Sequence, residues 1–206
     1  MSRDAYHHLA RQPVAGAPVV FTFHGTGGDE HQFTGLIDQI LPEAGIVSPR
    51  GDVSEYGANR FFRRQAEGVY DMADLAARTE KMTGFIRAHR EANEGAPIYG
   101  LGYSNGANIL ASVVLQAPEL FDRVVLMHPL IPWQPEPNAA LKSLDVLITA
   151  GRHDPICPLP LTESFADYLR KQGATVDLHL HGGGHEVSQQ EIDAITAFLK
   201  RVPEPA

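Results

Sequence analysis

The stretch Gly102-Tyr103-Ser104-Asn105-Gly106 decides how the rest of this chain is organised. An apolar run at residues 98–101 precedes it, and a segment whose apolar residues recur at one helix face follows it. The pattern predicts a strand, a very tight turn and a helix, with a serine at the tip. In that context G-x-S-x-G is typical of a nucleophile elbow, where small neighbours let strand and helix approach around a strained serine. The alternative is a glycine-rich turn with an ordinary N-cap serine.

The composition is that of a globular α/β protein. The chain has 206 residues, 43% apolar and 20% charged, which fits one domain over residues 1–206. No apolar run approaches the ~20 residues of a membrane span, and no secretory signal is expected at the N-terminus. The net charge of −8 argues against nucleic-acid or membrane partners. Cys157 is the one cysteine, so no intrachain disulfide forms, and we expect a cytoplasmic protein.

Strand-like and helix-like segments alternate along the chain. Residues rich in β-branched and aromatic types predict strands at 19–23, 46–48, 98–101, 124–127, 146–150 and 175–180, with an edge strand near 6–9. Helical periodicity between them predicts a single, mostly parallel sheet of about six to seven strands with helices on both faces. Residues 50–68 are expected to form a loop. Residues 128–145 are rich in proline, so we expect no helices there. The segment is also too short to form a lid domain.

Three reactive side chains each follow a different predicted strand: Ser104, Asp154 and His185. Their chain order is serine, acid, histidine, which is the order of α/β-hydrolases. In this arrangement His185 is the base that takes the proton of Ser104. Asp154 accepts the other imidazole N–H and fixes the tautomer of the ring. The sequence therefore predicts a Ser104–His185–Asp154 catalytic triad.

A glycine-rich loop, residues 24–30 (HGTGGDE), follows the strand at 19–23. It lacks the spacing of a Walker or a Rossmann loop, and a plain glycine turn is the alternative. Its position at a strand end suits an oxyanion hole, built from the backbone N–H groups of Thr26 and Asn105. His24 and His128 also stand at strand ends, where we expect a supporting role. His179 and His181 share one strand face and are expected to be structural. No recognised metal spacing occurs, so we expect no metal and no other cofactor.

The predicted pocket is a shallow, open cleft for a small substrate. Its expected walls are apolar and come from two loops: Phe61, Phe62, Leu130, Ile131 and Trp133. The two phenylalanines would serve equally well as anchors of a long loop. The arginines beside them, at positions 60, 63 and 64, are expected to form a solvated ion-pair cluster with Glu67 and Asp71.

The chain resembles the phospholipase/carboxylesterase family of small α/β-hydrolases, which includes acyl-protein thioesterases and is related to dienelactone hydrolases. The matching motifs are residues 24–30, 102–108, 151–155 (GRHDP) and 184–186 (GHE). Residues 61–64 (FFRR), 67–68 and 74–75 are similar to a bacterial branch assigned to quinone-related pathways. Dienelactone hydrolases proper use a cysteine at the elbow, whereas this chain has Ser104.

The resemblance implies a serine hydrolase that cleaves carboxylic esters through an acyl-enzyme. A thioesterase or another carbonyl hydrolase on the same fold is the first alternative. A non-catalytic ligand-binding protein of this fold is the second. The expected partner is a small-molecule ester, and a homodimer is compatible with the sequence.

Overall fold

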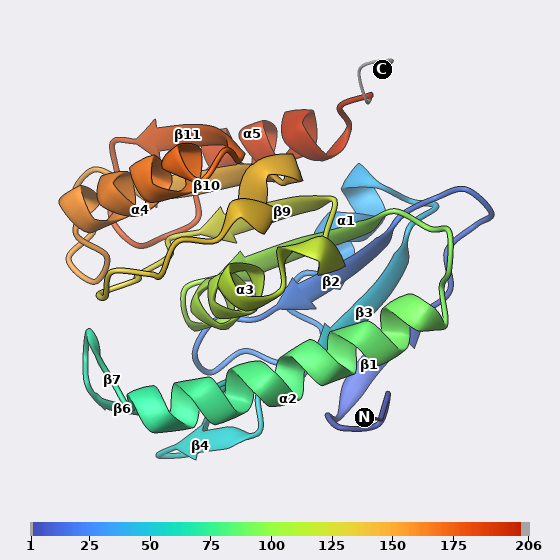
Figure 1. Cartoon of the computed structure of the whole chain (residues 1–206), viewed down its shortest axis with the longest axis horizontal. Helices are drawn as coiled ribbons and strands as arrows, with labels where there is room; N and C mark the ends of the chain where they lie inside the picture. Colours follow the sequence, from blue (N-terminus) through green and yellow to red (C-terminus); the bar gives the residue numbers. More distant parts are fainter. Residues whose placement is uncertain (1, 203–206) are drawn as a thin grey trace.

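The computed structural model of the protein describes residues 2–202 (Figure 1). In this part of the chain a seven-stranded sheet has the order β1-β3-β2-β8-β9-β10-β11. Only β1 pairs antiparallel to its neighbour, β3; the other neighbours are parallel. The strands are β1 (His8–Arg11), β2 (Val19–Phe23), β3 (Gly45–Pro49), β8 (Ile98–Tyr103), β9 (Arg123–Met127), β10 (Asp145–Gly151) and β11 (Thr175–His181).

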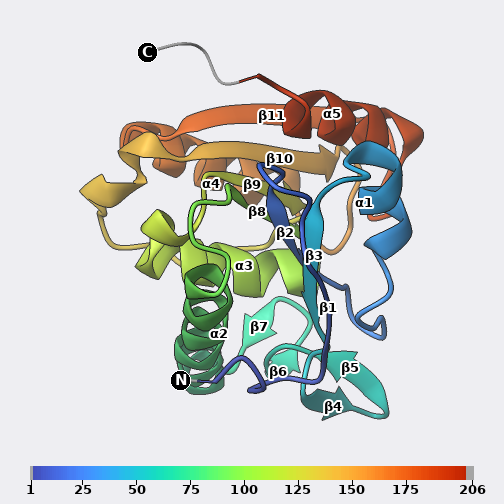
Figure 2. The ribbon, with the colours of Figure 1, turned by 90° about the vertical axis from the view of Figure 1, so that its right-hand side faces the viewer.

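Helices cover both faces of this sheet, as Figure 2 shows. The helices are α1 (Thr34–Ile40), α2 (Met72–Glu91), α3 (Asn105–Gln116), α4 (Leu159–Lys171) and α5 (Gln189–Leu199). Apolar side chains of α2, α3 and α4 pack in one core on the first face. Those of α1 and α5 pack in a second core on the other face. Because both faces are covered, the central strands are mostly apolar, and β2, β3 and β9 are buried at every position.

The predicted fold class is confirmed, but two connecting segments differ from the prediction. Residues 50–68 were expected to be a loop; they contain β4 (Val53–Glu55), β5 (Ala58–Arg60) and β6 (Arg64–Ala66). The first two strands form one hairpin, and β6 pairs with β7 (Val69–Tyr70) in a second. The segment between β9 and β10 was expected to lack helices; it includes a short 3-10 helix, η2 (Ala139–Ser143), capped by the Asn138 side chain. A second 3-10 helix, η1 (Pro118–Leu120), follows α3.

The parallel strands place the predicted site residues at one edge. Strands β2, β8, β9, β10 and β11 run in the same direction, so their carboxyl ends meet at the same side of the sheet. The loops that follow them carry Thr26, Ser104, His128, Asp154 and His185. This is the edge at which open α/β sheets bind ligands. No helix within residues 2–202 is both long enough and apolar enough to cross a membrane.

Candidate active site

Ser104 stands at the tip of a strained turn between β8 and α3. Its backbone has φ 52° and ψ −117°, and its hydroxyl makes no capping bond to the helix. Few residues other than glycine adopt a positive φ, and such strain persists only where the surroundings enforce it. The flanking glycines meet that demand: a Cβ on Gly102 would lie 2.6 Å from the Gly106 carbonyl oxygen, and one on Gly106 would lie 2.2 Å from that of Phe23. The hydroxyl is thereby free to face the sheet edge.

The hydroxyl of Ser104 lies 2.9 Å from Nε2 of His185. On the other side of the ring, Nδ1 of His185 lies 2.7 Å from Oδ2 of Asp154. The structure therefore brings the three residues of the predicted triad into one line of hydrogen bonds. Tyr103 supports this line, because its hydroxyl donates to the His185 carbonyl at 2.8 Å. Burial raises the pKa of Tyr103 to about 12, so it remains a donor at neutral pH.

Asp154 is held by four contacts in a buried position. Its Oδ1 accepts the backbone N–H groups of Ile156 and Cys157 at 2.8 and 2.9 Å. Its Oδ2 faces His185 and also lies 2.9 Å from Nδ1 of His128. Burial opposes ionisation, but these contacts outweigh it and hold the pKa of Asp154 below its usual range. The carboxylate is therefore charged and fixed at neutral pH.

The loop after β2 brings Thr26 to the same cavity. Within residues 2–202, neither the Thr26 N–H nor the Asn105 N–H has an intramolecular acceptor, and both residues line the cavity beside Ser104. Arg60 donates to the Thr26 hydroxyl at 2.7 Å, while the Asn105 side-chain oxygen accepts the Phe61 N–H at 2.7 Å. Two free backbone donors held in this way can stabilise an oxyanion that develops beside Ser104.

His24 supports the same region, as the sequence predicts. Its Nε2 accepts the Gly51 N–H at 2.9 Å, so the loop after β2 is tied to the loop after β3. The ring is buried, and burial lowers the pKa of His24 below its usual value. A neutral ring is what this contact requires, because Nε2 has to act as an acceptor.

The cavity beside Ser104 has a volume of about 220 Å³. Its walls differ from those predicted: of the five expected residues, only Leu130 lines it, and the side chains of Arg60, Arg64 and Glu67 take the place of the others. Phe61 and Phe62 are both 0% exposed. They anchor the segment after β5, where Phe61 packs edge-to-face on Phe23 and Phe62 on Tyr70.

Two other predicted wall residues also lie away from the cavity, because the burial of apolar surface draws them into the core. Ile131 and Trp133 line a separate cavity of about 170 Å³ against α4, together with Phe165 and Tyr168. Leu130 stays at the site because its backbone N–H donates to the Asn108 side chain at 2.7 Å. The pocket is consequently more polar than predicted.

The predicted solvated cluster of arginines is also only partly correct. Arg63 is exposed and pairs with Asp71 and Asp74, as expected for a surface ion pair. Arg60 instead is only 3% exposed; besides Thr26 it contacts the Phe62 carbonyl, and its guanidinium lies 3.6 Å from Glu55. Burial lowers the pKa of Arg60, but an arginine keeps its proton in proteins.

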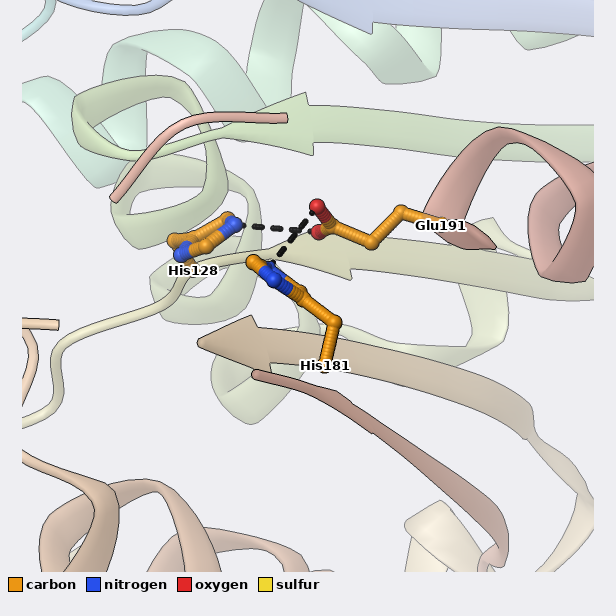
Figure 3. Close-up of side chains that lie close together, drawn as sticks. All are labelled: His128, His181 and Glu191. Atoms are coloured by element: carbon orange, nitrogen blue, oxygen red, sulfur yellow. Dashed lines mark ion pairs between the residues drawn. The ribbon is translucent and has the colours of Figure 1, made fainter. Parts of the chain in front are cut away.

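A second layer of buried polar groups lies behind Asp154, and the sequence indicated it only in part. His128 contacts Asp154 on one side, and its Nε2 lies 3.0 Å from Oε1 of Glu191. Nε2 of His181 lies 3.1 Å from the other oxygen of Glu191 (Figure 3). A signal for Glu191 was present: Ser188 and Glu191 form a capping box at the start of α5. Its contacts with the two histidines could not be predicted, because they depend on how separate parts of the chain fold together.

In the described part of the chain, residues 2–202, two sets of side chains bring metal-ligand atoms within 4.8 Å of one another. One consists of His128, His181 and Glu191, and the other of His128, Asp154 and His185. In the second set both histidines already contact Oδ2 of Asp154 through hydrogen bonds. The absence of a metal stays a prediction from the sequence.

Comparison with known proteins places this site in a family. Residues 4–193 match the dienelactone hydrolase family. The chain is 36% identical over 184 residues to MhqD of Bacillus subtilis (strain 168), whose name assigns it to the hydrolases; these residues cover 88% of this chain and 92% of MhqD.

Solved structures agree with this match. Atu2452 from Agrobacterium tumefaciens str. C58, a protein of unknown function, is 55% identical, with a TM-score of 0.92 over 97% of this chain and 98% of that chain. The Bacillus cereus carboxylesterase is 34% identical, with a TM-score of 0.88 over 93% and 92% of the two chains. The resemblance predicted from the motifs is thus confirmed. With a family match over most of its length and the serine elbow at the end of β8, the chain belongs to the dienelactone hydrolase family and is a hydrolase with the α/β-hydrolase fold.

Proposed function

We propose that the protein hydrolyses carboxylic esters with small or short acyl groups through a covalent acyl-enzyme. The observation that carries this proposal is the line of hydrogen bonds from Ser104 through His185 to Asp154, at distances of 2.9 and 2.7 Å. A protein that only binds a ligand has no need for a nucleophile, a base and an acid in this order. Relatives named as carboxylesterases support the choice of ester substrates.

The first step forms the acyl-enzyme. His185 Nε2 takes the hydroxyl proton as Ser104 Oγ attacks the carbonyl carbon of the ester. The negative charge that develops on the carbonyl oxygen is stabilised by the backbone N–H groups of Thr26 and Asn105. His185 then gives its proton to the departing alkoxide, and the alcohol leaves. Asp154 stabilises the imidazolium that exists between these two proton transfers.

The second step releases the acid. A water molecule attacks the acyl-enzyme and loses its proton to His185 Nε2, and the same two N–H groups stabilise the second oxyanion. His185 returns the proton to Ser104 Oγ, which restores the enzyme. A thioester follows the same sequence with a thiolate as the leaving group, so the geometry supports that alternative as well.

The size of the cavity supports small substrates. About 220 Å³ lies below the range of roughly 300–1,000 Å³ that is usual for sites of drug-sized ligands. Charged side chains at Arg60, Arg64 and Glu67 stand in its wall, which does not suit a long alkyl chain. The substrate class that fits best has a short acyl group.

The experiment that tests the proposal is labelling with a fluorophosphonate, followed by peptide mass spectrometry. We expect one modified residue, Ser104, and no label on the Ser104→Ala variant. Labelling at another residue, or no labelling of a folded protein, would contradict an acyl-enzyme at Ser104 and favour a ligand-binding role. Competition of the label by p-nitrophenyl acetate and by an acetyl thioester then ranks the two substrate classes.

A further inference from the structure

The predicted catalytic acid has two histidine partners. Oδ2 of Asp154 lies 2.7 Å from Nδ1 of His185 and 2.9 Å from Nδ1 of His128. The triad uses the first contact and leaves the second without a role. Behind His128 stands a second carboxylate, that of Glu191 from α5, at 3.0 Å from Nε2 (Figure 3). One imidazole ring is therefore placed between two carboxylates.

The backbone holds His128 in an unusual conformation to make this placement. Its φ is +50°, a region that non-glycine residues rarely occupy. The strain is supported on both sides: its N–H donates to the Thr149 carbonyl at 2.8 Å, and its carbonyl accepts the Cys157 thiol at 3.2 Å. A side chain held at a strained position with no exposed surface is a candidate for a specific role.

The protons of the cluster can be assigned from its contacts. Nδ1 of His181 accepts the Gly183 N–H at 3.1 Å, so a neutral His181 carries its proton on Nε2, the atom that faces Glu191. Both nitrogens of His128, in contrast, face carboxylate oxygens, which only accept hydrogen bonds. His128 therefore needs a proton on each nitrogen. The Glu191 oxygens lie off the N–H directions of both rings, at distances typical of ion pairs.

The charge balance requires the same assignment. The side chains of Asp154, Glu191 and His128 are all 0% exposed. With a neutral His128 the protein would bury two carboxylates with no cation between them, which is strongly unfavourable. With a protonated His128, one positive charge compensates the two negative charges, and the Thr149 hydroxyl and the Ser188 N–H donate further hydrogen bonds to Glu191.

We infer that His128 is a permanently protonated positioning residue, which orients Asp154 toward His185 and offsets part of its negative charge. The kinetic effect that we expect from His128 rests on the proposed function. Its protonation state does not. Burial opposes the charge of His128, yet Glu191 and Asp154 outweigh it and raise the pKa of His128. The reciprocal effect lowers the pKa of Glu191 to about 2, although burial alone would raise it.

The charged and titratable groups around His128 determine in which direction its positive charge affects catalysis. They are Asp154 and Cys157 after β10, Glu191 from α5, His181 from β11, His185 after β11 and Tyr103 from β8. Protonated His128, with a ring centroid 5.1 Å from that of His185, disfavours a second positive charge on His185. Removal of the cation should therefore be visible in the pH dependence of catalysis.

A metal ion held by His128, His181 and Glu191 is the rival explanation for these contacts. A metal bound at Nε2 of His181 would place the ring proton on Nδ1, where it would face the Gly183 N–H that Nδ1 accepts in the structure. Glu191 already accepts two hydrogen bonds, from Thr149 at 2.6 Å and from Ser188 at 2.7 Å. The contacts of His181 therefore favour protons over a metal.

The direct test is nitrogen-15 NMR of the imidazole rings in the purified protein at about pH 8, where an ordinary histidine is neutral. We expect His128, assigned by its loss in His128→Asn, to carry protons on both ring nitrogens. A single protonated nitrogen at His128 would overturn the inference whatever the activity is. A stoichiometric amount of zinc in the purified protein would also overturn it.

The kinetic test compares His128→Asn with Thr149→Val. The asparagine amide can still donate to Asp154 but carries no charge, so the acidic limb of kcat/KM should move to higher pH by about 1 unit. Thr149→Val removes a buried hydrogen bond to Glu191 and leaves every charge in place. It should lower stability and leave the limb where it is. An unmoved limb in a folded His128→Asn protein would contradict the inference.

A stability cycle covers the case in which His128→Asn folds poorly. That variant leaves Glu191 buried without its cation, so adding Glu191→Gln should restore part of the lost stability. We expect the double variant His128→Asn/Glu191→Gln to unfold at higher urea concentration than His128→Asn alone. A double variant less stable than either single one would show that the two side chains do not act as an ion pair.

Discussion

Arg60 donates a hydrogen bond of 2.7 Å from Nη1 to the hydroxyl of Thr26, so a buried guanidinium fixes the loop that supplies one proposed oxyanion donor. Replacement of Arg60 by methionine keeps an apolar stem and removes this anchor. Because a displacement of ~1 Å at a reacting group can cost on the order of 10²-fold in rate, we expect a fall in kcat of about that size. Steady-state kinetics with p-nitrophenyl acetate measures it.

Arg63 provides the matched control for that experiment. It lies three positions further along, is mostly exposed and contacts carboxylates of α2 and its N-cap. Arg63→Met should leave kcat within about 2-fold, because exposed ion pairs contribute little. If both methionine variants lose the same activity, the whole segment has been disturbed, and a specific link from Arg60 to Thr26 is wrong.

The triad assignment predicts non-additive effects. Ser104→Ala and His185→Ala should each lower kcat by several orders of magnitude, and the double variant should be little worse, since the residues act as one unit. Asp154→Asn should lower kcat by on the order of 10⁴-fold, as it does for other triad acids. Rates of ester hydrolysis above background measure each effect. Turnover of Asp154→Asn near that of the wild type would mean that another carboxylate supports His185.

The strained turn predicts a sharp difference between two glycines. Gly106→Ala places a Cβ 2.2 Å from the Phe23 carbonyl oxygen, so strand β2 and helix α3 have to separate. We expect a loss of about 1–3 kcal/mol in the free energy of unfolding, together with loss of activity. Gly35→Ala, in α1, meets no atom within 4 Å and should stabilise by up to ~1 kcal/mol. Urea unfolding distinguishes the two, and equal stabilities would contradict the close approach.

The small cavity predicts a preference for short acyl chains. With about 220 Å³ available, acetate and butyrate esters should be hydrolysed with higher kcat/KM than palmitate esters. Each methylene that finds no apolar contact forfeits up to ~0.8 kcal/mol of binding free energy. A series of p-nitrophenyl esters with increasing acyl length measures the trend. A maximum at twelve carbons or more would contradict this expectation and reveal an acyl channel.

The low pKa of Glu191 predicts how acid affects stability. Its folded pKa of about 2 lies below the value of 4.5 that applies without these contacts, so its ionised form stabilises the folded state above about pH 4.5. That stabilisation is lost as the pH falls through the folded value. Glu191→Gln should therefore be less stable at neutral pH, and its unfolding free energy should change less than that of the wild type between about pH 5 and pH 2. Parallel pH dependences would contradict this role.

The fold and the reactive residues could be predicted from the sequence because local patterns encode both. The elbow, the strands and the helices each have a period or a motif within a few residues, and the loop order follows from a parallel sheet. The burial of Phe61 could not be predicted from a local pattern. Its N–H donates to the Asn105 side chain, 44 positions away, and only the assembled β8–α3 turn provides that acceptor.

Arg60 and Glu191 illustrate the same limit for charged residues. Both types are usually solvated, so a sequence gives no reason to bury them. Arg60 is buried because Thr26, 34 positions earlier, accepts its hydrogen bond. Glu191 is buried because Thr149, 42 positions earlier, and His128 surround it in the folded protein. The supporting groups of the site therefore emerge only from the tertiary structure.

The distance along the chain between Ser104 and His185 has a consequence for biosynthesis. The two residues are 81 positions apart, and β11 and α5, which place His185 and Glu191, are made well after the turn that carries Ser104. With His185 as the proposed base, a growing chain on the ribosome presents the serine long before its base is made. A chain that is stalled or clipped before residue 185 would then carry an inert hydroxyl, and an incomplete copy would neither consume esters nor trap itself as an acylated fragment.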